Sequence, residues 1–206
     1  MNYPPVEVKV WGPYALFTSE FKTERVTYPV ITPSAARGVL EAIFWHKPMR
    51  WRVREIVVLN PIKHLSILRN EVSSRASPRN NGISITDDRA QRSSLVLKDV
   101  AYIIRADVYI PAGSTDADPA KYRDQFRRRI ERGQCWQRPY LGCREFAAGF
   151  GPVDGTAKPI DDNRDLGRLL FDLDYGPERA TPRFFNARLD GGVLYVPDSL
   201  YEGGGA

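Results

Sequence analysis

The chain opens with a strict alternation of apolar and polar residues. In residues 6–11 the valines at positions 6, 8 and 10 fall on one face, which predicts a β-strand that Gly12-Pro13 ends. Dense apolar segments predict further strands at 51–59, 100–110, 146–150, 169–175, 184–189 and 193–196. Asp190-Gly191-Gly192 predicts a tight hairpin turn between the last two strands.

Two helices are indicated by a capping residue, a proline and then apolar residues at helical spacing. Thr32-Pro33 begins the first, which is expected over residues 33–45. Asp118-Pro119 begins the second, expected over residues 119–132 with Gly133 at its end. Its apolar face is predicted to meet the core and consists of Tyr122, Phe126 and Ile130. A neighbouring polar and cationic stripe consists of Lys121, Gln125, Arg128 and Arg132.

The order of these elements predicts an α+β fold. Strand, helix, strand, insertion, strand, helix and strand, folded as a split βαβ unit, give a ferredoxin-like (RRM-like) N-terminal domain over residues 1–150. Residues 60–97 are expected to form long hairpins whose polar centre, with Asn80-Asn81-Gly82, makes a mobile tip. Residues 151–206 are expected to form a C-terminal antiparallel β-sheet extension, a second sheet packed on the first.

Composition narrows the function classes. The 206 residues contain no apolar run near the roughly 20 residues that span a bilayer, and the N-terminus lacks the layout of a signal peptide, so a cytoplasmic location is expected. Cys135 and Cys143 match no CxxC pattern and are expected to be reduced thiols. Arg outnumbers Lys by about three to one, which favours a phosphate-bearing partner such as nucleic acid.

Six segments carry a resemblance to a known family. They are 8–18 (VKVWGPYALFT), 24–28 (ERVTY), 33–43 (PSAARGVLEAI), 69–74 (RNEVSS), 126–129 (FRRR) and 141–146 (LGCREF). In this order they resemble the type I-C CRISPR subunits that process precursor RNA, the Cas5d/Cas5c family of the RAMP superfamily. The match extends to about residue 189.

The resemblance implies a function as well as a fold. A member of this family is expected to cut CRISPR precursor RNA within the repeat, without a metal ion or other cofactor. It is then expected to stay on the 5′ handle of the mature crRNA and to join the backbone and large subunits of the type I-C interference complex. Non-specific binding of double-stranded DNA, with a metal-dependent nuclease activity on it, is a further possibility.

Metal-independent cleavage of RNA needs a base, an acid and positive charge around the attacked phosphorus. The family places Tyr or His before the Trp at the end of the first helix, and a Lys-His pair at the start of the second. Here those positions hold Phe44, which has no ionisable atom, and Lys121-Tyr122. The loop after Phe44 is one residue longer than the family pattern, so His46 is a candidate substitute.

Several of the candidate residues can also be interpreted as structural rather than functional. His46 is either an acid–base group or an inert loop histidine, and His64, inside a predicted strand, is expected to be structural. Lys121 is expected to stabilise the phosphorane, whereas Tyr122 either packs in the core or donates from its hydroxyl. The four tryptophans could stack bases, with core packing expected for at least two. The RNA-binding candidates are Arg37, Arg127, Arg128, Arg132, Gly142 and Arg144.

Two functions follow from these residues. The first is an endoribonuclease that uses Lys121 with His46 or Tyr122. The second is a non-catalytic subunit that binds the crRNA handle, which the replacements at Phe44 and Tyr122 favour. The carboxylate pairs Asp87-Asp88 and Asp161-Asp162 are interpreted as solvated turns, since they lack the ligand pattern of a two-metal nuclease.

Overall fold

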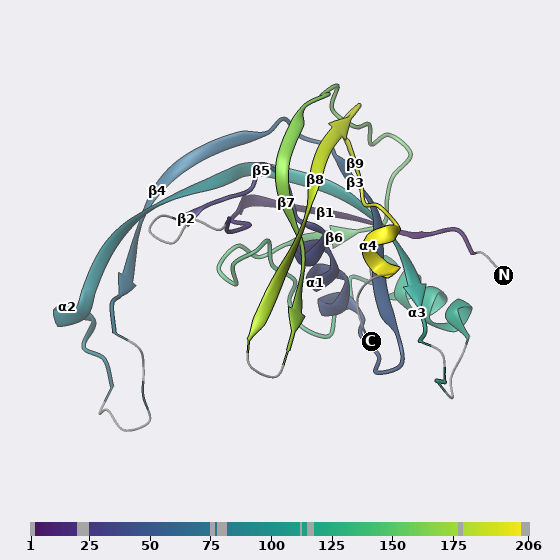
Figure 1. The fold of residues 1–206 in the computed structure, drawn as a ribbon, viewed down its shortest axis with the longest axis horizontal. Coiled ribbons are helices and arrows are strands. Elements are labelled where there is room, and N and C mark those ends of the chain that lie inside the picture. The colour runs from purple at the N-terminus through teal and green to yellow at the C-terminus, as the bar shows by residue number, and fades with distance from the viewer. Residues whose placement is uncertain are drawn as a thin grey trace.

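The fold is dominated by one curved, mostly antiparallel sheet, seen in a computed structural model (Figure 1). The structure describes residues 3–19, 25–74, 77, 82–111, 113–114, 118–176 and 179–202. Its strands are β1 (Val6–Ala15), β2 (Arg25–Val26), β3 (Arg50–Val58), β4 (Lys63–Val72), β5 (Arg89–Tyr109), β6 (Gly149–Gly151), β7 (Asp165–Tyr175), β8 (Ala180–Asp190) and β9 (Val193–Tyr195). Its helices are α1 (Pro33–Ile43), α2 (Ile85–Asp88), α3 (Pro119–Glu131) and α4 (Ser199–Glu202).

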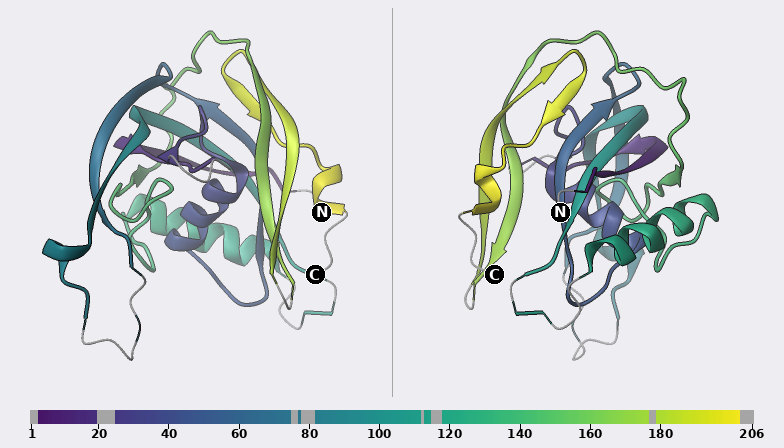
Figure 2. Two further views of the ribbon diagram at one scale, coloured as in Figure 1. Left: turned by 60° about the vertical axis from the view of Figure 1, so that its left-hand side comes forward. Right: turned by 90° about the vertical axis from the view of Figure 1, so that its right-hand side faces the viewer.

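The sheet runs in the order β6-β1-β5-β3-β9-β8-β7, and β2 and β4 also pair with β5. It arches over α1 and α3, which lie on its concave side (Figures 1 and 2). The predicted core faces are confirmed: the three valines of β1 are buried, as are Tyr122, Phe126 and Ile130 of α3. Apolar burial between one sheet face and two helices therefore holds the body together.

β5 is the longest strand and the centre of the sheet. Its 21 residues pair with β4 along the first half and with β1 and β3 along the second. It bends at Asp99, whose φ is +53°. The predicted insertion is thus one long hairpin, β4 with the first half of β5, rather than several hairpins. Gly82 is described, whereas Asn80 and Asn81 of the predicted mobile tip lie outside the described residues. We call this hairpin the arm.

Two predicted ends, those of β1 and α1, are wrong. β1 runs through Gly12-Pro13 to Ala15, because its pairing with β5 continues on both sides of Pro13, at Gly12 with Val100 and at Tyr14 with Lys98. α1 ends at Ile43 rather than Trp45. The backbone N–H groups of Trp136 and Gln137 donate to the carbonyl of Ala42, and Phe44 turns to an extended conformation.

The α+β class is confirmed, and the ferredoxin-like assignment stays a prediction. The tail does not form a separate sheet packed on the first, because β9 pairs with β3 and joins β8 and β7 to the same sheet edge to edge. The division into domains at residue 150 stays a prediction. In the described part of the chain, no helix is long and apolar enough to cross a membrane.

Candidate functional site at the ends of two helices

Three aromatic side chains meet where α1 ends and α3 begins. Phe44 follows the last residue of α1, and Tyr122 lies in the first turn of α3; their ring centroids are 6.2 Å apart. The imidazole of His46 is exposed, and its ring centroid lies 5.1 Å from that of Tyr122. Tyr122 is 1% exposed and Phe44 3%, so both rings are buried between the two helices. We call these two rings the aromatic floor.

Lys121 brings a cation to the same floor. Asp118 caps α3 by accepting a hydrogen bond from the backbone N–H of Ala120, which fixes the first turn. The exposed Lys121 then places its Nζ atom 5.6 Å from the centre of the Tyr122 ring. The structure therefore brings an ammonium group and an imidazole, from two separate elements, onto one tyrosine ring.

Contacts between the helices hold this arrangement in place. The indole Nε1 of the buried Trp51 donates to the carbonyl oxygen of Phe44 at 3.0 Å, and its ring packs on Phe126 with centroids 4.6 Å apart. Arg129 donates to the carbonyl of Ile43 at 3.0 Å and lies over the Phe44 ring. Arg129, which follows the RNA-binding candidates Arg127 and Arg128, therefore joins α3 to the end of α1.

The tryptophans differ from expectation. Only Trp51 is buried, whereas Trp11, Trp45 and Trp136 are 43%, 53% and 76% exposed. Trp45 directly follows Phe44, and the backbone of Trp136 binds the last carbonyls of α1, so two exposed indoles flank the end of that helix. Core packing of at least two tryptophans is therefore wrong. His64 lies in β4 as predicted, with its side chain exposed.

Gly142 lies against a different part of the body. Its φ is +84°, and a Cβ atom at this position would lie 1.9 Å from the carbonyl oxygen of Leu16. The preceding residue, Leu141, accepts a hydrogen bond from the backbone N–H of Leu16 at 3.1 Å. Only glycine fits this close approach with this backbone conformation. We call residues 141–146 the Gly142 loop.

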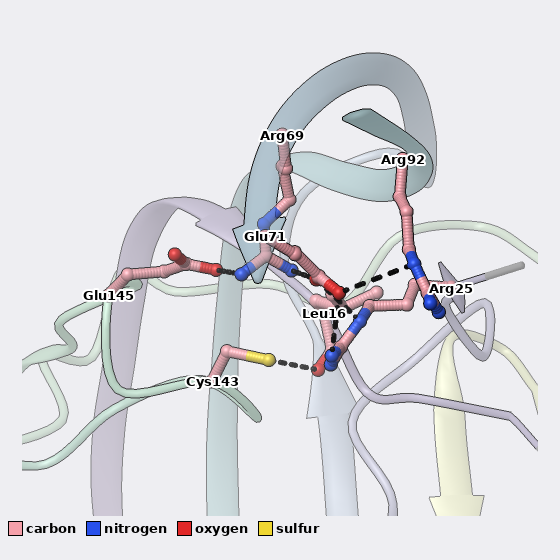
Figure 3. Close-up of polar contacts among 7 residues, drawn as sticks. All are labelled: Leu16, Arg25, Arg69, Glu71, Arg92, Cys143 and Glu145. Atoms are coloured by element: carbon pink, nitrogen blue, oxygen red, sulfur yellow. Dashed lines mark hydrogen bonds and ion pairs between the residues drawn. The ribbon is translucent and has the colours of Figure 1, made fainter. Parts of the chain in front are cut away.

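An ion-pair network joins the arm to the Gly142 loop (Figure 3). The half-buried carboxylate of Glu71 on β4 is surrounded by three guanidinium groups, at 2.8 to 3.9 Å, from Arg25, Arg69 and Arg92. Arg69 also pairs with Glu145 of the loop at 2.5 Å. Beneath them, burial raises the pKa of the Cys143 thiol. Residues 25–28, 69–74 and 141–146, which are far apart in sequence, therefore meet here.

The predicted RNA-binding residues do not share one surface. Arg128 and Arg132 are exposed, as the stripe on α3 predicts, and Arg144 is exposed on the Gly142 loop. Arg127 instead borders a cavity beside Pro5 and Glu7 near the N-terminus. Arg37 of α1 is held by Asp172 of β7, with Nη2 2.7 Å from Oδ1. Lys121, Tyr122, His46 and Phe44 thus come together, whereas Arg37, Arg127 and Gly142 lie elsewhere.

Two arginines of β3 were missed by sequence reasoning. Arg52 places its guanidinium carbon 3.5 Å from the centre of the Tyr109 ring, and Arg50 lies beside the loop that carries His46. The alternation of arginine at positions 50, 52 and 54, at the start of the strand predicted over residues 51–59, was the available signal, because it places a row of cations on one face. Among the described residues, no three His, Cys, Asp or Glu side chains gather as a metal site.

Comparisons with known proteins show the family of the chain. Residues 6–197 match the Cas5d model of the CRISPR-associated protein family Cas5. A CRISPR pre-crRNA endoribonuclease Cas5d from Thermus thermophilus is 47% identical, with 96% of this chain and 93% of that protein covered. A protein of the same name from Mannheimia succiniciproducens is 41% identical, with 96% of each chain covered.

Solved structures show the same fold at low identity. A functionally uncharacterized protein from Streptococcus mutans superposes with a TM-score of 0.70 at 19% identity, over 95% of this chain and 93% of that one. A CRISPR-associated protein superposes with a TM-score of 0.69 at 22% identity, over 94% and 91%. The match to the family model covers most of the chain, and two relatives exceed 40% identity. The chain therefore belongs to the Cas5d family of CRISPR-associated proteins.

Proposed function

We propose that the protein is an endoribonuclease that cuts CRISPR precursor RNA within the repeat, by attack of a ribose 2′-hydroxyl and without a metal ion. The observation that carries the proposal is the approach of Lys121 and His46, from two elements, to the ring of Tyr122. The names of the two relatives, CRISPR pre-crRNA endoribonuclease Cas5d, support the substrate.

The chemistry assigns a role to each side chain. The 2′-oxygen forms a bond to the adjacent phosphorus, and the bond from phosphorus to the 5′-oxygen breaks. A base accepts the proton of the 2′-hydroxyl, and an acid gives a proton to the departing 5′-oxygen. The imidazole of His46 suits either proton transfer, and the ammonium of Lys121 stabilises the negative charge of the phosphorane. The products carry a 2′,3′-cyclic phosphate and a 5′-hydroxyl.

Tyr122 and Phe44 serve in this proposal as support rather than as reacting groups. Their rings are 1% and 3% exposed, so a ribose-phosphate can reach the rim of the aromatic floor but not its centre. Packing fixes both rings, and the rings in turn fix the positions of Lys121 and His46. Replacing Tyr122 with Phe should therefore preserve cleavage to within about 10-fold, since one proton-transfer group is worth about 100-fold or more.

Cleavage of the cognate repeat in the presence of EDTA tests the proposal. Single-turnover rates are measured for the wild type, Lys121→Ala and His46→Ala. Each substitution should slow cleavage by about 100-fold or more without equal loss of RNA affinity. Lys158→Ala and His64→Ala are matched controls, since both residues are exposed and lie away from the two helix ends; they should leave the rate unchanged.

The substrate supplies a second control. Repeat RNA with a 2′-deoxy nucleotide at the scissile position lacks the nucleophile and should bind without being cut. Full activity of Lys121→Ala would overturn the assignment of the site. Loss of all cleavage in EDTA, with recovery on adding Mg²⁺, would overturn the metal-independent mechanism.

A non-catalytic subunit that binds the crRNA handle is the second candidate function. The observation that favours it is the aromatic floor, in which Phe44 has no ionisable atom and the ring of Tyr122 is buried. Binding of the repeat with no cleavage at any pH from 5 to 10 would support this candidate over the first.

The finer assignments are part of the same proposal. The strand order β6-β1-β5-β3, with α1 and α3 on one side, supports a ferredoxin-like first part. After cleavage the protein would stay on the 5′ handle and bind the backbone and large subunits of a type I-C interference complex. Co-purification of the handle with those subunits, from cells that express the whole system, checks this step.

A further inference from the structure

A large cleft opens where β3 is left without a partner on one side. β9 pairs with β3 only from Glu55 to Val57, so the first half of β3 borders open space. The cleft has a volume of about 990 Å³ and lies between α1 with β3 on one wall and β7, β8 and α4 on the other. This volume is at the upper end of the range for small-molecule sites, about 300–1,000 Å³.

The floor of the cleft is a guanidinium group between two tyrosines. Arg52 of β3 lies 3.5 Å from the centre of the Tyr109 ring and 5.5 Å from that of Tyr201 on α4. A guanidinium stacked on aromatic rings keeps its planar N–H edge available for a phosphate. Tyr175 at the rim of the cleft is 79% exposed, so its ring can stack on a base.

The charges in the cleft divide into paired and unpaired groups. Arg37 is paired with Asp172, and Arg183 with Asp174 at 3.0 Å. Within the described part of the chain, neither Arg50 nor Arg52 forms an ion pair. Two cations of β3 are therefore available to an anionic ligand, and the carboxylates of Asp107, opposite Arg52, and of Glu41 attract them only from beyond ion-pair distance.

α4 is a fixed wall of the cleft. The hydroxyl of Tyr201 donates to the carbonyl of Val53 at 2.9 Å, which satisfies one backbone group of the unpaired edge of β3. Arg183 donates to the carbonyl of Leu200 at 2.9 Å. These contacts hold the tyrosine against Arg52, so the site is formed before any ligand arrives.

The cleft adjoins the cluster at the helix ends. Arg50 donates to the carbonyls of Lys47 and Met49, in the loop that carries His46. Trp51 borders the cleft and donates to the carbonyl of Phe44. A chain of nucleotides that passes His46 can therefore continue past Arg50 to Arg52.

We propose that this cleft binds single-stranded RNA next to the scissile linkage, with Arg50 and Arg52 on its phosphates and Tyr175 stacked on a base. The inference rests on the proposed function, because it names the path of that same RNA. The residues of β3 and α4 thereby become part of the RNA-binding surface, in addition to the helix ends.

The test compares binding of the cognate repeat RNA by the full chain and by the double variant Arg50→Gln/Arg52→Gln. The affinity should fall by about 10-fold to 100-fold, and the slope of log affinity against log salt should fall by about 1.4, the value for two phosphate contacts on a single strand. Arg188→Gln is the matched control, since Arg188 is exposed on β8 outside the cleft; it should change neither quantity. Thermal melting checks that each variant is folded.

Cross-linking locates the RNA. Repeat RNA carrying 4-thiouridine on one side of the cut should form cross-links to Tyr109 or Tyr175. The inference would be overturned if a folded double variant kept its affinity and its salt slope and no cross-links formed in the cleft. The cleft would then not be a binding site for the repeat RNA. If the double variant does not fold, the single variant Arg50→Gln is measured instead, because the hydrogen bonds of the Arg50 side chain to described residues go to the loop carbonyls of Lys47 and Met49.

The two proposals fail in different ways. Wild-type protein that binds repeat RNA but does not cut it would contradict the endoribonuclease proposal. The affinities of the arginine variants would still test whether the cleft binds RNA. Wild-type protein that cuts the repeat, with binding insensitive to Arg50 and Arg52, would contradict the cleft alone. Protein that binds no RNA would contradict both.

Discussion

Replacing Gly142 with alanine separates backbone strain from a steric clash. At φ +84° an alanine is in the left-handed region, which costs about 1–2 kcal/mol for a residue with a Cβ atom. The new Cβ would also lie 1.9 Å from the carbonyl oxygen of Leu16, so the Gly142 loop has to move. Movement breaks the hydrogen bond between the buried residues Leu16 and Leu141, which adds about 1–3 kcal/mol.

Two other glycines provide matched controls. Gly167 of β7 has φ +68° with open space around its added Cβ, so Gly167→Ala carries only the strain, about 1–2 kcal/mol. Gly38 in α1 has open space and no positive φ, so Gly38→Ala should stabilise the protein by about 0.5–1 kcal/mol. Gly142→Ala should destabilise it by about 2–5 kcal/mol.

Urea unfolding followed by tryptophan fluorescence measures the three free energies of unfolding. The expected order of destabilisation is Gly142→Ala, then Gly167→Ala, with Gly38→Ala more stable than the wild type. A Gly142→Ala variant that loses no more stability than Gly167→Ala would refute the reasoning, since it would mean that the loop moves off Leu16 without cost.

Three further perturbations have defined outcomes. Hydrogen bonds from Thr156 and Lys9 lower the pKa of the exposed Asp154 to about 2. Thr156→Ala should therefore raise that pKa toward 3.8, which an NMR titration measures. The stabilisation linked to this lowered pKa is present above pH 3.8 and is lost as the pH falls toward 2. Trp51→Phe leaves the carbonyl of Phe44 without its donor and should cost about 1–3 kcal/mol in urea unfolding. Glu71→Gln leaves three guanidinium groups around a neutral amide and should cost about 1–3 kcal/mol, less in 1 M salt, where screening weakens their repulsion.

Much of the fold could be predicted because local rules determine it. The cap and proline at Thr32-Pro33 and at Asp118-Pro119 begin α1 and α3 where expected, and periodicity gives the buried faces. The end of α1 could not be predicted, since it depends on Trp136 and Gln137, which reach the last carbonyls from more than 90 residues away in sequence. The joining of the tail to the first sheet depends in the same way on a long-range pairing between β9 and β3.

The candidate site, like the fold, has parts that the sequence could predict and parts that depend on long-range contacts. Lys121, Tyr122 and Phe44 were found by the resemblance, and His46 by the longer loop after Phe44. The structure places these four side chains near one another, and their catalytic roles stay a prediction. The basic residues were chosen from local runs of arginine. Such a run cannot show which arginines bind other groups of the protein and which are available to RNA. Arg129 holds the end of α1 and Arg37 pairs with Asp172, while Arg50 and Arg52, which interrupt an apolar strand, border the cleft beside β3.

The length of β5 restricts how the arm can change. One strand serves both the arm and the body, so a single-residue insertion or deletion in its first half would turn every side chain beyond that point to the opposite face. Residues added or removed in matched pairs, one on β4 and one on β5 near α2, would keep the register of both halves. We therefore expect the arm to lengthen or shorten only at its outer end, which makes that end the place to graft a peptide tag or a reporter.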